Sequence, residues 1–177
     1  MTDTTRSLHG RCTAQAMLPS PFGPLLWART TSGIAGMWFD AQKWFPTAFE
    51  APERPDDPLI LDAAAQLDDY FGGRRRTFDL PLDLHGTPFQ KAVWAALLRI
   101  EPGHTCTYGD IAVAVGSPQA VRAVGMAVGR NPVGIIVPCH RVIGRDGTLT
   151  GYAGGLDRKQ ALLRLEGVLY PQQESLL

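Results

Sequence analysis

The sequence predicts an α+β protein in which a small antiparallel sheet precedes a helical region. Short apolar runs separated by Pro- and Gly-containing turns fill the first forty residues, as is typical of strands joined by hairpins. Apolar residues recur at helical spacing through most of the second half. The segment from His85 to Pro88 lies between these patterns and has the composition of a linker. We therefore expect an N-terminal domain over residues 1–86 and a C-terminal domain over residues 87–177.

The N-terminal elements follow from local patterns. Strands are expected over residues 12–18, 25–30 and 34–39, because the first two flank a Pro- and Gly-rich turn and the third follows Gly33. Residues 59–71 carry apolar side chains at helical spacing and end at Gly72, which predicts an amphipathic helix. Residues 80–84 alternate like a short edge strand.

Four helices are expected in the C-terminal half, over residues 89–100, 108–115, 118–128 and 156–165. Trp94 would lie at the margin of the apolar face of the first of these helices. Ser117 is a good N-cap for the third, with Pro118 at its first helical position. The second and third helices are joined by a tight turn that contains Gly116, which predicts a helix-turn-helix.

Composition limits the possible functions. No apolar run approaches the roughly 20 residues that span a membrane. Three cysteines without a paired pattern favour a reducing, cytoplasmic setting, and no Cys and His grouping predicts a metal or cofactor. Residues 1–84 carry 8 Lys and Arg against 11 Asp and Glu, whereas residues 85–177 carry 9 against 6. The resulting net charges of −3 and +3 make the C-terminal half compatible with a phosphate-backbone partner.

Cys139 is the strongest candidate for a reactive group. It follows Pro138 and precedes His140, at the polar end of an apolar run over residues 135–137 that predicts a strand. A free thiol with a pKa of about 8.5 is only slightly ionised at neutral pH, so a nucleophilic role requires neighbours that titrate. Adjacent residues on a helix do not face each other, so His140 is expected to act on Cys139 through a bridging water.

The helix over residues 118–128 has two interpretations. Arg122 is its only charged residue and the only one between Asp110 and Arg130. Three alanines share its approximate face at helical spacing: Ala120, Ala123 and Ala127. Such a helix can pack in a core, or it can approach a minor groove closely while the arginine enters between bases.

Two further features also leave alternatives open. Glycines at 151, 154 and 155 are compatible with a flexible loop or with a lid whose N–H groups hold a planar ligand. Glu166 lies in the last turn of a helix, where the macrodipole prefers a cation. It is either an ordinary exposed glutamate or a partner of His140.

Together these motifs resemble the O6-alkylguanine-DNA alkyltransferase family. The resemblance covers roughly residues 89–167 and rests on three blocks in order: Asn131-Pro132, Pro138-Cys139-His140-Arg141-Val142 and Gly151-Tyr152-Ala153-Gly154-Gly155. It implies an N-terminal ribonuclease-H-like domain and a winged-helix-like C-terminal domain. The implied activity is DNA repair by single-turnover transfer of the alkyl group from O6-alkylguanine, and possibly O4-alkylthymine, to Cys139.

The resemblance also implies roles for individual residues. Cys139 accepts the alkyl group, His140 is its base through a water, Glu166 orients His140, Asn131 braces the cysteine turn, and Tyr108 contacts the flipped base. The implied DNA-binding set is Arg122 as the inserted finger with Tyr108, Ser117, Gln119, Ala120 and Ala123. The implied lid over the base is formed by Tyr152, Ala153, Gly154 and Val142.

Two departures from the family pattern bear on the pocket. Gly134 stands where some relatives have proline, and Ala153 replaces a serine found in some members. The zinc ligands of some relatives are not apparent. The implied partner is double-stranded DNA containing alkylated guanine, bound through its minor groove by a monomer that does not associate with membranes. A non-catalytic protein that binds DNA lesions and a Cys-His thiol hydrolase are the alternatives.

Overall fold

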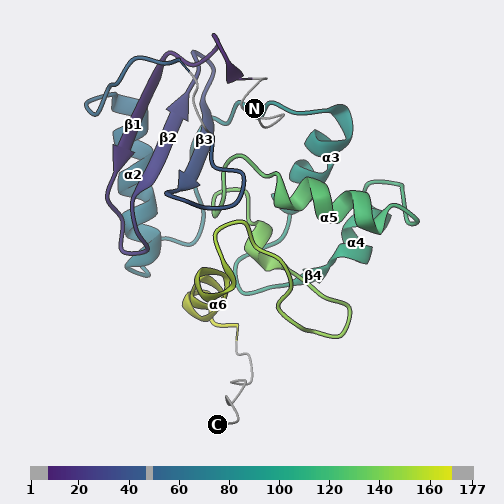
Figure 1. Cartoon of the computed structure of the whole chain (residues 1–177). Coiled ribbons are helices and arrows are strands. Elements are labelled where there is room, and N and C mark those ends of the chain that lie inside the picture. The colour runs from purple at the N-terminus through teal and green to yellow at the C-terminus, as the bar shows by residue number, and fades with distance from the viewer. Residues whose placement is uncertain (1–7, 47–49, 169–177) are drawn as a thin grey trace.

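The computed structural model describes residues 8–46 and 50–168 of the 177-residue chain. The N-terminal sheet consists of β1 (Ala14–Leu18), β2 (Leu25–Arg29) and β3 (Ile34–Phe39), paired antiparallel in the order β1-β2-β3. The helix α2 (Pro58–Phe71) packs against one face of this sheet (Figure 1). Asp57 caps α2, because its side chain accepts hydrogen bonds from the first backbone N–H groups of the helix. The expected strands and helix of this domain are therefore confirmed within one or two residues.

The expected edge strand over residues 80–84 is reduced to an isolated bridge between Leu82 and Ile34. The backbone N–H of Ile34 donates to Pro81 at 2.8 Å, and the N–H of Asp83 donates to Ile34 at 2.9 Å. Proline has no N–H to continue a ladder, so the pairing stops there. Gly33 is required at this contact, since a Cβ on it would lie 2.4 Å from the carbonyl oxygen of Pro81.

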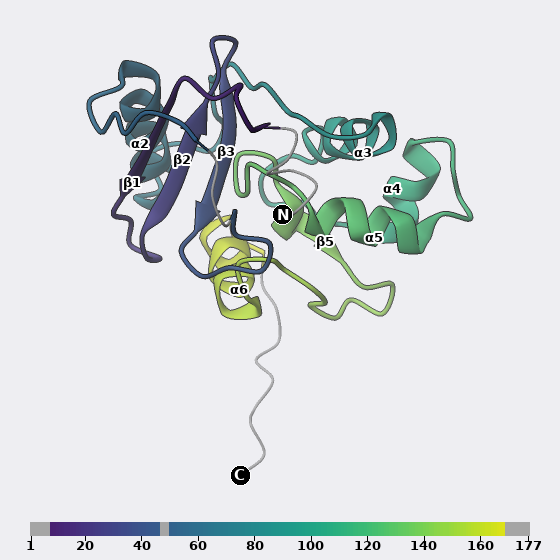
Figure 2. The same ribbon diagram turned by 45° about the horizontal axis from the view of Figure 1, so that its top comes forward.

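The C-terminal region contains the helices α3 (Pro88–Leu97), α4 (Tyr108–Ala114), α5 (Val121–Gly129) and α6 (Leu156–Leu165). Figure 2 shows α3, α4 and α5 grouped beside the sheet, with α6 below its edge. Two short strands, β4 (Cys106–Thr107) and β5 (Val142–Ile143), pair in parallel. None of the helices in residues 8–46 and 50–168 has the length and apolar character needed to cross a membrane.

Two details of the expected helices are wrong. Trp94 is fully buried rather than marginal, and its indole N–H donates to the Ala127 carbonyl of α5 at 2.9 Å. The helix expected from Pro118 begins at Val121, with Ala120 as an N-cap that makes no side-chain hydrogen bond. The N–H of Ala120 instead donates to the carbonyl of Ser117 at 2.8 Å, which closes a turn before the helix. Ser117 is therefore not the cap.

The strand expected over residues 135–137 is also wrong, because this segment is a tight turn. Ile135 has a φ of 68°, a conformation that β-branched residues rarely adopt. The turn is held to the edge of the sheet, since the N–H of Met37 donates to the Pro132 carbonyl at 2.8 Å. A short 3-10 helix, η1 (Cys139–Arg141), follows directly. The turn is closed by hydrogen bonds from Ile136 to Gly134 and from Val137 to Val133, and it places Cys139 beside residues of the N-terminal domain.

Candidate active site

Cys139 is the first residue of η1 and is held by Asn131. The Nδ2 atom of Asn131 donates to the Cys139 Sγ at 3.1 Å and to the Val137 carbonyl at 2.7 Å. Its Oδ1 accepts from the N–H of Val133 at 3.0 Å, which fixes the orientation of the amide. Asn131 therefore braces both ends of the turn and directs a hydrogen-bond donor at the sulfur.

The sulfur is nearly covered, since Cys139 is only 6% exposed. Burial raises the pKa of the Cys139 thiol, although the Asn131 hydrogen bond and the charge of Lys159 favour the thiolate. Burial therefore favours the protonated thiol at rest. The thiol needs a base when it reacts.

His140 is fully buried next to that thiol, and its Nε2 lies 2.9 Å from Oε1 of Glu166. Burial lowers the pKa of His140, while the contact with Glu166 opposes this effect. The second ring nitrogen, Nδ1, is buried and makes no hydrogen bond to any described residue. A buried polar atom without a partner costs about 1–3 kcal/mol of stability. The Nδ1 atom is therefore a candidate acceptor for a proton during a reaction.

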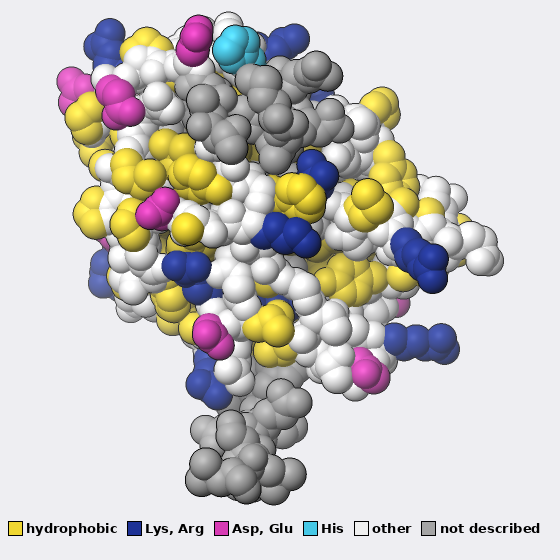
Figure 3. All heavy atoms as spheres, in the orientation of Figure 1, with side chains coloured by type: hydrophobic (Ala, Val, Ile, Leu, Met, Phe, Trp, Pro, Cys, Tyr) yellow, Lys and Arg dark blue, Asp and Glu magenta, His cyan; other side chains and the backbone are white. Residues whose placement is uncertain are grey.

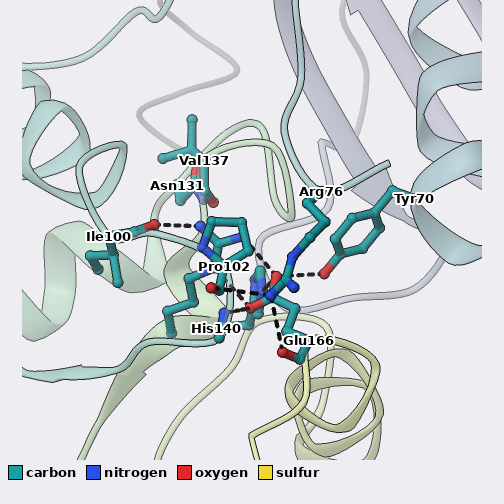
Figure 4. Close-up of polar contacts among 10 residues, drawn as sticks. Tyr70, Arg76, Ile100, Pro102, Asn131, Val137, His140 and Glu166 are labelled. Atoms are coloured by element: carbon teal, nitrogen blue, oxygen red, sulfur yellow. Dashed lines mark hydrogen bonds and ion pairs between the residues drawn. The ribbon is translucent and has the colours of Figure 1, made fainter. Parts of the chain in front are cut away.

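Glu166 is the centre of a buried polar network rather than an exposed glutamate (Figure 4). Arg141 binds its carboxylate in a bidentate manner, at 2.7 Å to Oε1 and 2.9 Å to Oε2, and also donates to the Ile100 carbonyl. The hydroxyl of Tyr70, from α2 of the other domain, donates to Oε1 at 2.8 Å. Burial would raise the pKa of Glu166, but hydrogen bonds from His140 and Arg141 outweigh it and hold this pKa well below its usual range.

A cavity of about 660 Å³ opens beside Cys139, within the range of small-molecule sites. Five of the fourteen expected site residues line it. Its described lining includes Cys139, Tyr108, Arg122, Tyr152 and Ala153, together with Trp44, Arg130, Gly151 and Met126. Gly154 and Asn131 lie on a small adjoining cavity that Cys139 also lines. The structure thus brings the cysteine motif, the glycine-rich segment and one face of α5 to one cavity.

Val142 does not belong to the lid. Its side chain is completely buried in β5, where the residue pairs with Cys106, and it is absent from the described lining of the cavity. The strand pairing turns this side chain into the core.

Lys159 is a site residue that the sequence interpretation missed. It is fully buried on α6, and its Nζ donates to the carbonyls of Val142 at 2.6 Å, Thr150 at 2.9 Å and Gly151 at 3.3 Å. It thereby ties the glycine-rich lid to the strand after the cysteine motif. The available signal was its position on the apolar face of the helix, three and four residues before Leu162 and Leu163.

Replacing Lys159 with methionine is expected to slow alkylation of Cys139 by iodoacetamide about 10-fold at pH 7, because a charge that favours the thiolate is lost. Burial lowers the pKa of Lys159 to about 8, so the ammonium is still mostly protonated at pH 7. The same change at Arg164, an exposed cation of the same helix, is the control. Equal labelling rates for the two variants would contradict this role.

The helix-turn-helix presents an exposed surface at the cavity rim. Arg122 and Ala123 are exposed on α5, as is Gln119 before it, while Ser117 and Ala120 are half-buried. Ala127 is buried and so does not share the outer face expected for the three alanines. Large hydrophobic side chains are exposed here as well, with Met126 at 70% and Val113 at 66%. Figure 3 shows Lys and Arg side chains interspersed with hydrophobic ones on one face of the molecule.

The fold and site define a class of protein in which a cysteine lines a cavity beside a helix-turn-helix and is supported by a His–Glu pair. Comparison with known proteins identifies the family. Residues 14–84 match the ribonuclease-like domain of 6-O-methylguanine DNA methyltransferase, and residues 88–168 match its DNA binding domain. The chain belongs to the 6-O-methylguanine DNA methyltransferase family.

Individual relatives are similar over most of their length. The methylated-DNA–protein-cysteine methyltransferase of Methanosarcina acetivorans is 48% identical over 154 residues, which cover 86% of this chain and 97% of that protein. The constitutive enzyme of the same name from Bacillus subtilis is 45% identical over 157 residues, covering 87% and 95%. The crystal structure of Mycobacterium tuberculosis OGT in complex with DNA superposes with a TM-score of 0.79 at 47% identity, covering 87% of this chain and 92% of that one.

Proposed function

We propose that this protein repairs DNA by transferring the alkyl group of O6-alkylguanine to Cys139, once per molecule. One observation supports this most strongly: a buried Cys139–His140–Glu166 arrangement opens onto a cavity that also meets the exposed helix-turn-helix. Family membership and relatives named as methylated-DNA–protein-cysteine methyltransferases agree with this activity. The transfer requires a reduced Cys139, which favours a reducing compartment.

The two family matches correspond to two domains with different roles. We infer a boundary at residues 86 and 87, since the matches end at 84 and begin at 88. The capping box of α3 begins at Thr87, which supports this boundary. The C-terminal domain, residues 87–177, carries the alkyl acceptor and the DNA-binding surface, and the protein acts as a monomer.

The reaction begins with proton removal from the thiol. The Nε2 of His140 is occupied by Glu166, so Nδ1 is the nitrogen that takes the Cys139 proton, through a bridging water. The imidazolium that forms is stabilised by the Glu166 carboxylate, which Arg141 and Tyr70 hold in position. Asn131 and the charge of Lys159 stabilise the thiolate.

The thiolate then attacks the alkyl carbon opposite the O6 atom of guanine. A sulfur–carbon bond forms while the carbon–O6 bond breaks, and its electron pair leaves with the base. The negative charge that develops on guanine is stabilised by lid N–H groups and by the Tyr108 hydroxyl, which exchanges its hydrogen bond to the Thr150 carbonyl for one to the base. The departing guanine takes up a proton. The thioether at Cys139 is stable, so the protein cannot react again.

The target base must leave the duplex to reach this cavity. Flipping costs a few kcal/mol, and less for a damaged pair. Arg122 lies on the cavity rim and fills the gap left by the base, while the small side chains Ala120 and Ala123 allow α5 to approach the minor groove closely. Gln119 and Ser117 contact the sugar-phosphate backbone of the DNA near the start of α5.

The stoichiometry of transfer tests the proposal. Excess DNA that carries radiolabelled O6-methylguanine should transfer one methyl group per protein and then stop. Continued turnover, or lesion binding without transfer, would replace this proposal by a hydrolase or by a lesion-binding protein, respectively.

Replacing Arg122 with alanine is expected to slow repair of duplex DNA by about 10-fold or more, with little change for the free O6-methylguanine base. The arginine compensates for an extruded nucleotide, and the free base requires no extrusion. Transfer rates on the two substrates measure this difference. Equal losses on both would contradict the role of Arg122 in flipping.

The rate of transfer is expected to fall at acidic pH, as His140 becomes protonated and no longer accepts the thiol proton. Burial lowers the pKa of His140, so this loss should begin below the usual histidine value of about 6.5. A pH profile of single-turnover rates checks the position of the acid limb. A limb centred above 6.5 would exclude the buried His140 as the base.

A further inference from the structure

The lid segment is held at two consecutive carbonyls, one by the N-terminal domain and one by α6. The backbone N–H of Lys43, from the loop after β3, donates to the Ala153 carbonyl at 3.1 Å. The Nη1 of Arg158 donates to the Gly154 carbonyl at 2.8 Å. The Arg158 donor is a side chain, so it can be altered without changing the backbone, whereas only proline would remove the Lys43 N–H.

Arg158 is anchored to the sheet rather than to its own helix. Its Nε donates at 2.9 Å to the carbonyl of Phe22, which lies in the turn between β1 and β2. Its guanidinium carbon lies 4.4 Å from the ring centre of Phe39, the last residue of β3. A planar guanidinium with several fixed donors suits this task, because it can bond two carbonyls and stack on a ring at once. The side chain thus joins α6 and the lid to one end of the sheet, where the β1–β2 turn and the end of β3 lie together.

The lid has no spare room at this point. A Cβ on Gly154 would lie 2.7 Å from the ring of Tyr152 and 3.0 Å from the ring of Phe39. The lid backbone therefore packs directly between a residue that lines the cavity and a residue of the sheet. A shift of the lid away from the sheet would move Tyr152 within the cavity.

Fixing the direction of a carbonyl also fixes the direction of the N–H group in the same peptide. A trans peptide is planar, so its C=O and N–H groups point in opposite directions. The Ala153 carbonyl is held by Lys43, which sets the direction of the Gly154 N–H in the same peptide plane. Ala153 lines the main cavity, and Gly154 lies with Cys139 on the adjoining one. The orientation of the lid donors relative to the sulfur thus depends on contacts with the N-terminal domain.

We propose that Arg158 is a positioning residue for base recognition. It holds the lid over the cavity by anchoring it to the N-terminal sheet. This inference rests on the proposed alkyl transfer and assigns the N-terminal domain a part in it. Arg158 acts on the ligand through the lid and leaves the chemistry of the thiol unchanged.

The test compares Arg158→Met with Arg164→Met, since Arg164 is an exposed cation on the same helix. Three rates are measured for each: transfer from methylated duplex, transfer from free O6-methylguanine base, and labelling of Cys139 by iodoacetamide. Displacing a reacting group by about 1 Å can cost about 100-fold in rate. We therefore expect Arg158→Met to lose 10- to 100-fold in both transfer rates, with iodoacetamide labelling within 2-fold of the control.

A conservative variant keeps the test valid if Arg158→Met folds poorly. Arg158→Lys retains the charge but can donate to only one of the two carbonyls in a fixed geometry, so its transfer rates should lie between those of the wild type and Arg158→Met. Transfer rates of both variants equal to the control would overturn the proposal. A parallel fall in iodoacetamide labelling would also overturn it, because the effect would then lie at the thiol. If the wild-type protein itself transfers no methyl group, the proposed function fails instead.

Discussion

Replacing Cys139 with alanine is expected to abolish methyl transfer completely, while binding to methylated duplex DNA persists. The sulfur is the atom that forms the new bond, and no other described cysteine lines the cavity. The side chain is small and packed, so its loss leaves little space and disturbs the turn only slightly. The substitution does not alter the surface of α5 that is proposed to contact DNA, so binding should persist.

Cys12→Ala is the matched control for this variant. Cys12 is buried in a separate small cluster of the N-terminal domain, where burial raises the pKa of its thiol to about 11. Transfer should therefore be retained in this control. If Cys139→Ala still accepted a methyl group, the assignment of the acceptor would be wrong, and if it lost all DNA binding, the cysteine would have a structural role instead.

Replacing Glu166 with glutamine is expected to have the second largest effect, on both stability and rate. The change leaves the buried Arg141 guanidinium without its anion and also weakens the contacts to His140 and Tyr70. Breaking a buried ion pair in this way costs about 3–5 kcal/mol, a large part of the 5–15 kcal/mol that stabilises a typical domain. The transfer rate should fall by about 100-fold or more, because the imidazolium of His140 loses its counter-charge.

Denaturant unfolding and single-turnover kinetics measure the two effects of Glu166→Gln. Glu101→Gln serves as the control, because Glu101 is an exposed carboxylate in the same domain. A variant with the stability and rate of this control would show that the network does not support the reaction.

The regular parts of this fold were predictable from local patterns. The strands over residues 14–39 and the helices α2, α3 and α6 follow from turn composition and apolar periodicity, which act within a few residues. Cys139, Asn131 and Tyr152 could be placed in the site because contiguous motifs carry them. The fold then brings the cysteine motif and the glycine-rich motif to one cavity.

Contacts between distant segments were not predictable. Ile135 has a positive φ within a turn that is closed by the Val137 N–H and the Val133 carbonyl, which the isoleucine run itself does not reveal. Tyr70 contacts Glu166 across 96 residues of sequence, and the motif that contains Arg141 does not reveal its bidentate contact with Glu166. The position of Lys159 on the apolar face of α6 signals burial, but only its three carbonyl partners explain how a lysine is accommodated there.

Peptide mass spectrometry of the reacted protein tests the central claim most directly. After incubation with duplex DNA that contains O6-methylguanine, the protein is digested and the position of the added methyl group is determined. We predict one methyl group on the peptide that contains Cys139, and none on the peptides with Cys12 and Cys106. A methyl group on another residue, or an unmodified Cys139 after complete repair of the DNA, would contradict the account.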